Sequence, residues 1–465
     1  MIDLLLASGG AEHPQVPFGV TMLFSGLLGS LVLCLAFEEK IHAKKSVIAG
    51  IFALVCLFLG MVFHLFPKED LIVFEKFHLP LYIPGIDWEV IAIIFGASLF
   101  VDVTSKSGLF TWMAIKLTKA SKGDPRKLLW FYGILTVFFS AVLNNVTAMI
   151  IVGSLTAVSL DKLGRKEKLL GFLLIEGLLT NVGGLLTLIS SVPNIIVGNA
   201  APISFVTFFI KASPYVVLST IVTLWMGARL FGIRKLGSDE ERKEASLLVS
   251  SFDENDGIES RGFFWFGTIM TLGFLLTMAT TSVLPYIKEL KMGFVAMGFA
   301  AIMLVRYKSV ADKFYKAIDW DLLGFFAGLF VVINVMEHAQ VLALIGKGVE
   351  VVIGPEVTPI GTGSLLIGSA IFSSVTDNIP LSAMLAKILT SLGTHPDSAL
   401  WWSVIFGSNL GGNITPIGSA STLVAVTIIH KHKLPMSFAG FVKVAVPYAT
   451  VQIILATAYV LLFLM

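Results

Sequence analysis

Polar side chains interrupt four long apolar stretches of this chain, and we expect its chemistry at these interruptions. Two of them read NNVT at 144–147 and TDNIP at 376–380, and two read NVGG at 181–184 and NLGGN at 409–413. A helix inside hydrocarbon breaks only where its freed backbone groups face protein or a water-filled cavity. Each break exposes carbonyl oxygens, which attract a cation such as Na⁺, and N–H groups, which attract an anion. The pattern therefore indicates an ion-binding centre.

The oxygen-bearing and glycine residues at these interruptions form the predicted site. We expect Na⁺ to be held by Asn145, Asn378 and Asp377, with no other metal and no cofactor. No soft ligands converge there, which argues against a transition metal. The full set of predicted ion- and substrate-binding residues is Ser140, Asn144, Asn145, Thr147, Asn181, Gly183, Gly184, Thr187, Ser373, Thr376, Asp377, Asn378, Asn409, Gly411, Gly412, Asn413 and Thr415.

Two acidic residues are the predicted coupling groups, for Na⁺ or H⁺. A carboxylate at membrane depth costs roughly 2.5–3.5 kcal/mol, so Asp377 needs a cation, a proton or hydrogen-bond donors. Asp377 either binds the coupled ion or caps the half-helix that follows it. Glu176 precedes the interruption at 181–184 by five residues. It either carries a proton or hydrogen-bonds a neighbouring helix.

The composition requires a membrane-embedded body to position these residues. Apolar types make up 56% of the 465 residues and charged types only 14%, whereas a soluble domain carries about 25% charged residues. The net charge of +2 argues against a nucleic-acid partner. No nucleotide-binding loop, nucleophile motif or metal-ligand cluster is recognisable, which argues against an enzyme or an ATP-driven pump.

Hydropathy and loop charge predict a multi-pass protein of the inner (plasma) membrane. Two apolar stretches with polar centres, 128–160 and 362–393, are predicted re-entrant hairpins. If the basic loops are cytoplasmic, the first hairpin enters from inside, the second enters from outside, and both termini lie outside. Full spans are expected at 17–36, 46–66, 87–104, 168–198, 213–230, 262–285, 291–305, 320–337, 399–430 and 441–463.

Three sequence blocks recur in order at a nearly constant offset. WEVIAIIFGASLFV from Trp88 matches WDLLGFFAGLFV from Trp320, FSAVLNNVTA matches FSSVTDNIPL, and NVGGLLTLISSVPN matches NLGGNITPIGSAST. We interpret 1–231 and 262–465 as inverted five-span repeats joined by a hydrophilic cytoplasmic linker at 232–261. Each repeat contains one hairpin and one unwound helix, at 168–198 and 399–430. Interrupted helices at matching positions of inverted repeats are typical of a transporter's central site.

These blocks resemble the ion transporter superfamily, and NNVTAMI and SSVTDNIPLSAM are most similar to its arsenite-permease, D-type Na⁺/H⁺ antiporter and P-protein branch. The superfamily also includes divalent-anion:sodium symporters. The resemblance implies a homodimer with a scaffold and an elevator-type transport domain. It also implies that Asn145, Thr147 and Asn378 belong to the binding tips. The tips differ from the Ser-Asn-Thr of dicarboxylate symporters, and Asn144 stands where D-type antiporters usually have Asp.

The sequence leaves several functions open. We favour a secondary transporter of a small inorganic ion that exchanges Na⁺ for H⁺ by alternating access, because Asp377 and Glu176 offer two coupling carboxyls. Proton-driven arsenite or antimonite efflux is the close alternative, since oxygen and amide ligands suit a neutral polyol. A sodium-coupled citrate or dicarboxylate symporter is the third. A channel would differ from all three by unitary currents.

Overall fold

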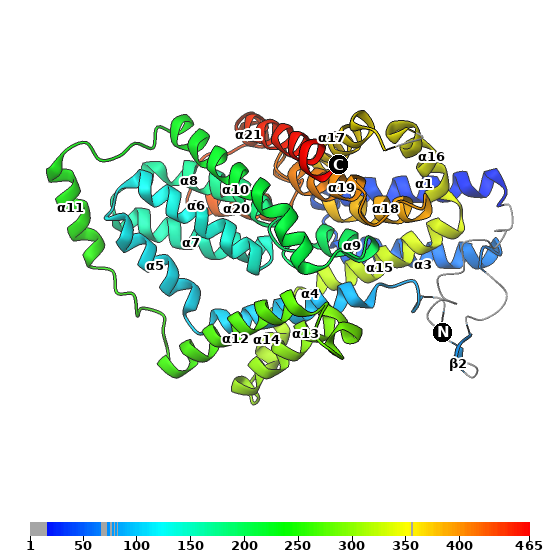
Figure 1. Ribbon diagram of the computed structural model, residues 1–465, viewed down its shortest axis with the longest axis horizontal. Coiled ribbons are helices and arrows are strands. Elements are labelled where there is room, and N and C mark those ends of the chain that lie inside the picture. Colours follow the sequence, from blue (N-terminus) through cyan, green and yellow to red (C-terminus); the bar gives the residue numbers. More distant parts are fainter. Residues whose placement is uncertain (1–15, 67–71, 75–76, 79, 81, 355–356) are drawn as a thin grey trace.

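The computed structural model describes residues 16–66, 72–74, 77–78, 80, 82–354 and 357–465, and these are almost entirely helical (Figure 1). The elements before the linker are α1 (Phe18–Ala36), α2 (Glu38–Ile41), α3 (Lys45–Val62), β1 (Ile72–Phe74), β2 (Phe77–His78), α4 (Trp88–Ser105), α5 (Leu109–Ser121), α6 (Pro125–Val142), α7 (Asn145–Lys162), η1 (Lys166–Lys168), α8 (Leu169–Gly183), α9 (Val192–Ala200) and α10 (Phe205–Leu230). The two strands form a small antiparallel pair.

The remaining elements follow the linker or lie within it. They are α11 (Asp239–Ser250), α12 (Arg261–Thr280), α13 (Ile287–Leu304), η2 (Val305–Tyr307), α14 (Ala311–Ala317), α15 (Trp320–His338), α16 (Val341–Ile353), α17 (Pro359–Val375), α18 (Asn378–Ser391), α19 (Ala399–Gly411), α20 (Ala420–Lys431), α21 (Phe438–Tyr459) and η3 (Val460–Leu464). Within the described residues, eight continuous helices are long and apolar enough to cross a membrane. The broken helices α8–α9 and α19–α20 account for the two other predicted spans, and the predicted all-α membrane fold is confirmed.

Matching caps begin the matching helices of the two halves. The Asp87 side chain accepts from backbone N–H groups at the start of α4, and Asp319 does the same for α15. Ser204 caps α10, and Ser437 caps α21. Such side chains satisfy N–H groups that have no partner within the helix, so they fix where each helix begins.

One sequence prediction needs correction. The span expected at 213–230 begins earlier, at Phe205, because the helix continues through Pro214, and α21 likewise contains Pro447. Membrane helices tolerate an internal proline when their surroundings satisfy the freed backbone group. The hydrophilic linker predicted at 232–261 contains one helix, α11. Glu254 in this linker binds Lys116 and Lys119 of α5 at 2.7 and 3.0 Å, and these hydrogen bonds lower the pKa of Glu254.

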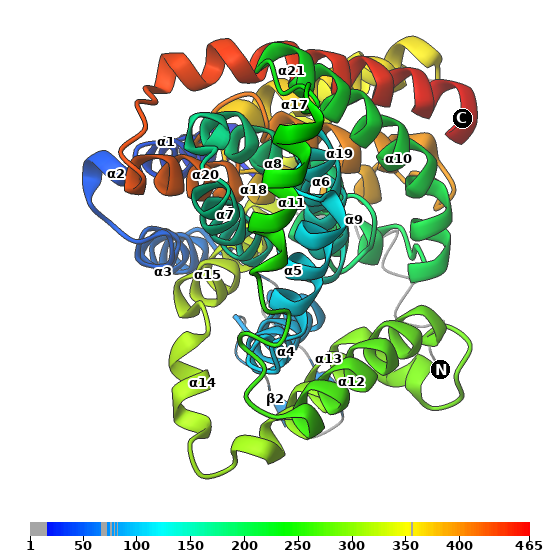
Figure 2. The same ribbon diagram turned by 90° about the vertical axis from the view of Figure 1, so that its left-hand side faces the viewer.

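Helices of one half pack against helices of the other half in equivalent pairs. Helix α3 packs along α15 while α13 packs along α4, and α7 contacts α20 while α18 contacts α9. Figures 1 and 2 show α12 and α13 together beside α4, and Figure 1 shows hairpins α6–α7 and α17–α18 on opposite sides of the centre. This arrangement agrees with an internal two-fold relation. The inversion of the repeats across a membrane and the elevator division remain predictions.

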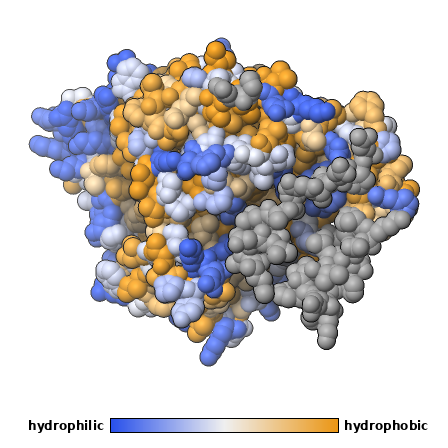
Figure 3. Space-filling model, turned by 45° about the vertical axis from the view of Figure 1, so that its right-hand side comes forward, coloured by the Kyte–Doolittle hydropathy of each residue, from blue (hydrophilic) through white to orange (hydrophobic). Residues whose placement is uncertain are grey.

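The outer surface is largely apolar. Figure 3 shows hydrophobic side chains over much of one face, with polar ones gathered in separate patches. On α12, Ile269, Leu272 and Leu276 are 64%, 57% and 67% exposed. A soluble protein seldom exposes such a continuous apolar strip, and lipid contact explains it.

A candidate ion site at two broken helices

A buried group of amides joins the end of α8 to the break between α19 and α20. Asn181 Nδ2 donates to Asn413 Oδ1 at 2.8 Å, and Asn181 Oδ1 accepts from Ser419 and Ser421 at 3.0 and 3.2 Å. Asn413 Nδ2 in turn donates to Gln452 Oε1 of α21 at 2.8 Å. All five side chains are buried, so each hydrogen bond is made in a medium where an unmet polar group is costly.

A second group joins α19 to the break between α8 and α9. Asn409 Oδ1 accepts from Ser191 Oγ at 2.6 Å, and Asn409 Nδ2 donates to Asn194 Oδ1 at 2.9 Å. Asn194 Nδ2 donates to the carbonyl oxygens of Gly184 and Thr187, which the break has freed, at 2.7 and 3.0 Å. Two separate groups of hydrogen bonds therefore join the broken helix α8–α9 to the broken helix α19–α20.

Each hairpin is tied to its own broken helix by equivalent hydrogen bonds. In the first half, Ser140 donates to the Thr180 carbonyl and Thr187 to the Ala141 carbonyl. In the second half, Ser373 donates to the Ser408 carbonyl and Thr415 to the Ser374 carbonyl, which are the corresponding pairs. Asn145 adds a contact between the first tip and the network, since its Nδ2 donates to Asn181 Oδ1 at 3.2 Å.

The four glycines at the breaks permit close approach. Their backbone angles lie outside the left-handed region, so conformational freedom is not their role. A methyl group on Gly183 would lie 2.7 Å from Val137 Cα, and one on Gly184 would lie 2.6 Å from Asn145 Oδ1. On Gly411 it would overlap the Ala370 carbonyl oxygen, and on Gly412 it would lie 2.8 Å from Ser419 Cβ.

Gly411→Ala should destabilise the protein by about 1–3 kcal/mol or more, because an added methyl in a filled interior forces the backbones of α17 and α19 apart. Gly368→Ala is the matched control, since Gly368 lies on α17 with open space at its Cβ position. That change should be neutral or slightly stabilising. Thermal unfolding of the detergent-solubilised variants measures both effects, and equal unfolding temperatures would contradict the packing role of Gly411.

The two hairpin tips differ in charge and in partners. Asn144 caps α7 by accepting from the Thr147 N–H at 2.7 Å, and its side chain is exposed. Asp377 caps α18 by accepting from the Ile379 N–H at 3.1 Å, while its other oxygen accepts from Lys45 Nζ at 2.6 Å. Asp377 thus acts as a cap and also holds a cationic group.

Glu176 lies on α8 away from the tips. It is completely buried, and its Oε1 accepts from Thr156 Oγ1 of α7 at 2.6 Å. Its Oε2 has no hydrogen-bond partner among the described residues. An uncompensated buried carboxylate is strongly destabilising, so this oxygen is a place for a proton or a cation.

The structure brings together part of the predicted set. Hydrogen bonds join Asn145 and Asn181 to the central network, whereas Asp377 contacts α3 instead, and the Asn378 backbone only begins α18. The proposed Na⁺ ligands therefore have separate surroundings in this arrangement. Sequence reasoning did not assign six residues that make these contacts. The repeated blocks were the only sequence signal for the serines among them. The six are Lys45, Ser191, Asn194, Ser419, Ser421 and Gln452.

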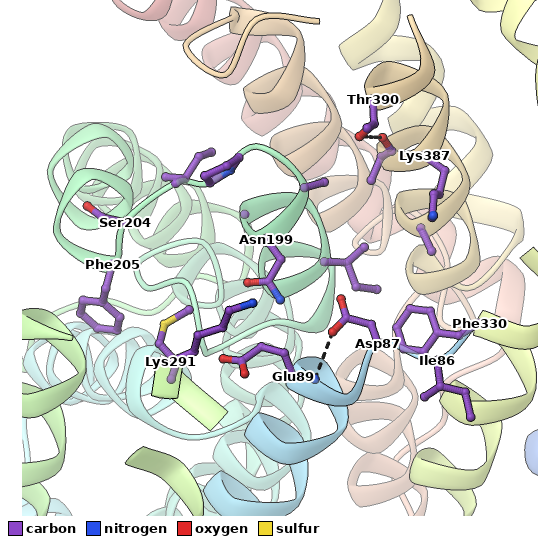
Figure 4. A pocket seen from close by; sticks show the side chains of 18 of the residues that line it. Ile86, Asp87, Glu89, Asn199, Ser204, Phe205, Lys291, Phe330, Lys387 and Thr390 are labelled. Carbon is purple, nitrogen blue, oxygen red and sulfur yellow. Dashed lines mark hydrogen bonds between the residues drawn. The ribbon is translucent and has the colours of Figure 1, made fainter. Parts of the chain in front are cut away.

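A cavity of about 710 Å³ lies between α4, α13 and α15 on one side and α9, α10 and α18 on the other. Figure 4 shows Lys291, Glu89 and Asp87 around it, with Lys387 entering from α18. Lys288 also lines it. Lys387 forms an ion pair with Glu337 of α15 at 3.1 Å. A much smaller cavity, about 50 Å³, adjoins Asn144 at the first tip. The described residues contain no group of three His, Cys, Asp or Glu suited to hold a metal.

Comparison with known proteins gives consistent similarities. A family model described as citrate transporter, CitMHS, matches residues 32–407. An uncharacterized transporter of Mycobacterium tuberculosis is 28% identical over 382 residues, covering 81% of this chain and 86% of that protein. The human P protein is 24% identical over 506 residues, covering 91% of this chain and 60% of that protein. The crystal structure of the Alcanivorax borkumensis YdaH transporter aligns with a TM-score of 0.59 and 14% identity, covering 90% and 98% of the two chains.

Proposed function

The chain belongs to the citrate transporter family CitMHS, and on that premise we propose that it exchanges Na⁺ for protons by alternating access. Membership confirms the resemblance to the ion transporter superfamily, and the protein is a membrane transporter of that family. The substrate and the coupled ion are our proposal. We also propose that it resides in the plasma membrane as a homodimer, which the molecular mass of the purified protein in detergent would test.

The observation that carries this proposal is the position of Asp377. Its carboxylate stands at the tip of the hairpin α17–α18 and already binds the cationic Lys45 Nζ. A site that holds an ammonium group through one carboxylate oxygen also suits Na⁺, which prefers oxygen ligands. Glu176 supplies a second carboxyl with an unmet oxygen. Two carboxyls in different surroundings support an exchange in which one holds Na⁺ and the other a proton.

Uptake of a citrate-type anion is the second candidate, and the large cavity favours it. Its volume of about 710 Å³ is sufficient for a tricarboxylate, and Lys288, Lys291 and Lys387 line it. Glu337 pairs with Lys387 at 3.1 Å. The two carboxylates that line the cavity offset part of the remaining charge, but both have backbone donors: Asp87 caps α4, and Glu89 accepts from the Gly293 N–H at 2.9 Å. The family description agrees with this class of substrate.

Reconstitution in liposomes with an internal pH dye tests the proposal. With an outward proton gradient, addition of Na⁺ or Li⁺ to wild-type vesicles should alkalinise the lumen, and protein-free vesicles should not respond. No response to Na⁺, together with a response to citrate, would select the second candidate. A response to arsenite alone would select arsenite efflux and reject both.

A further inference from the structure

The tip of hairpin α17–α18 is linked to α3 by a largely buried ion pair. Lys45, the first residue of α3, places its Nζ 2.6 Å from Asp377 Oδ2, and the two side chains are 24% and 15% exposed. Glu38 Oε1 lies 3.6 Å from the same Nζ and is an alternative partner. Helix α3 packs along α15, whereas the hairpin packs along α19. The ion pair therefore adds a link between two groups of helices that also meet where α15 contacts α18.

The equivalent of Lys45 in the other half of the molecule can be identified from a repeated contact. Asp321, the second residue of α15, accepts from the Ser46 N–H at 3.1 Å. Glu89, the second residue of α4, accepts from the Gly293 N–H at 2.9 Å. Ser46 thus corresponds to Gly293, and the residue before Gly293 is Met292.

The other half cannot form this ion pair. Met292 corresponds to Lys45, and Asn144 corresponds to Asp377, so both members are neutral there. If the hairpins exchange positions during transport, only the arrangement in this structure gains the attraction between the two charges. The charge difference between the repeats would then favour one arrangement of the empty protein over the other.

We propose that Lys45 is a built-in cation that competes with the transported cation for Asp377 and holds the empty protein in this arrangement. This inference rests on the proposed cation transport. A cation that binds Asp377 Oδ2 must displace Lys45, whose ammonium group can turn to Glu38. Release of the tip then accompanies cation binding, and return of Lys45 accompanies cation release. The ion pair thereby links occupancy of the site to movement of the hairpin.

Lys45→Met tests the competition, because it copies the neutral residue of the other half at similar length. In the liposome assay, the half-saturating Na⁺ concentration should fall by about tenfold, since a hydrogen-bonded charge no longer opposes Na⁺. Lys44→Met is the matched control, since the adjacent Lys44 is exposed, and it should behave as wild type. Lys45→Arg keeps the charge and should stay close to wild type. An unchanged constant in Lys45→Met, or an equal shift in Lys44→Met, would overturn the proposal.

A second measurement does not depend on which ion is transported. Glu337 and Lys387 also connect α15 to α18 in this arrangement, so the pair Glu337→Cys and Lys387→Cys reports it by oxidative cross-linking. Protein with only Cys34 and Cys56 gives the background. In choline chloride, adding Lys45→Met should slow cross-linking about two- to tenfold, because the population of this arrangement falls. Equal rates would reject the holding role of Lys45. Failure of the wild-type protein to respond to Na⁺ in the liposome assay would reject the proposed function, whatever the cross-linking rates are.

Discussion

Asp377→Asn is expected to reduce coupled transport by about a hundredfold while the protein still reaches the membrane. Asparagine retains an oxygen that can accept from the Ile379 N–H, so α18 keeps its cap. What is lost is the negative charge. Hydrogen bonds to a charged group contribute about 1.5–3 kcal/mol, and about 1.4 kcal/mol corresponds to a tenfold change in binding. Initial rates of Na⁺-dependent pH change in liposomes, normalised to the amount of protein, measure the effect.

The control for this substitution is Asp319→Asn. Asp319 also caps a helix, accepting from the Leu322 N–H at 2.9 Å at the start of α15, but it has no role in the proposed site. Its replacement should leave transport within about twofold of wild type, since a retained cap costs little. Full activity of Asp377→Asn with an unchanged Na⁺ dependence would show that Asp377 is only a cap and that cation binding takes place elsewhere.

The breaks and tips of the helices were predictable from the sequence because their causes are local. The asparagines and glycines at 181–184 and 409–413 end α8 and α19, and Asn144 and Asp377 cap α7 and α18. The repeat then indicated that the two sets belong together. Hydroxyls such as Ser191 and Ser419 were present in the matching blocks, but their buried partners were not apparent without the fold.

The partners of these residues were not predictable because they come from distant segments. Lys45 belongs to a basic stretch that indicates a cytoplasmic loop, and only the approach of α3 to the second hairpin makes it a partner of Asp377. Gln452 lies in an apolar span, where a lone amide has no obvious role. In the structure it accepts from Asn413 and donates to Thr223 Oγ1 at 2.9 Å. Long-range contacts of this kind depend on tertiary packing rather than on local pattern.

Glu176→Gln should lower the rate of proton-coupled exchange by at least about tenfold and flatten its dependence on pH, because glutamine cannot bind or release a proton. Stability should change little, since the glutamine oxygen can still accept from Thr156 Oγ1. The measurement is the initial rate in liposomes at several pH values, with thermal unfolding of the same preparations as a check on folding. An unaltered pH profile would establish that Glu176 only connects α7 and α8.

Thr156→Val separates the two roles of Glu176 further. The substitution is nearly equal in size and removes the one hydrogen bond to this carboxyl among the described residues. If Glu176 carries the proton, the carboxyl still titrates without that bond, so the pH profile should move along the pH axis and keep its shape. If Glu176 only links two helices, Thr156→Val, which removes the bond, should lower stability, Glu176→Gln, which retains it, should change stability little, and both should leave the profile in place. Both substitutions concern the same 2.6 Å contact, and only a proton-carrying role predicts that they affect the profile differently.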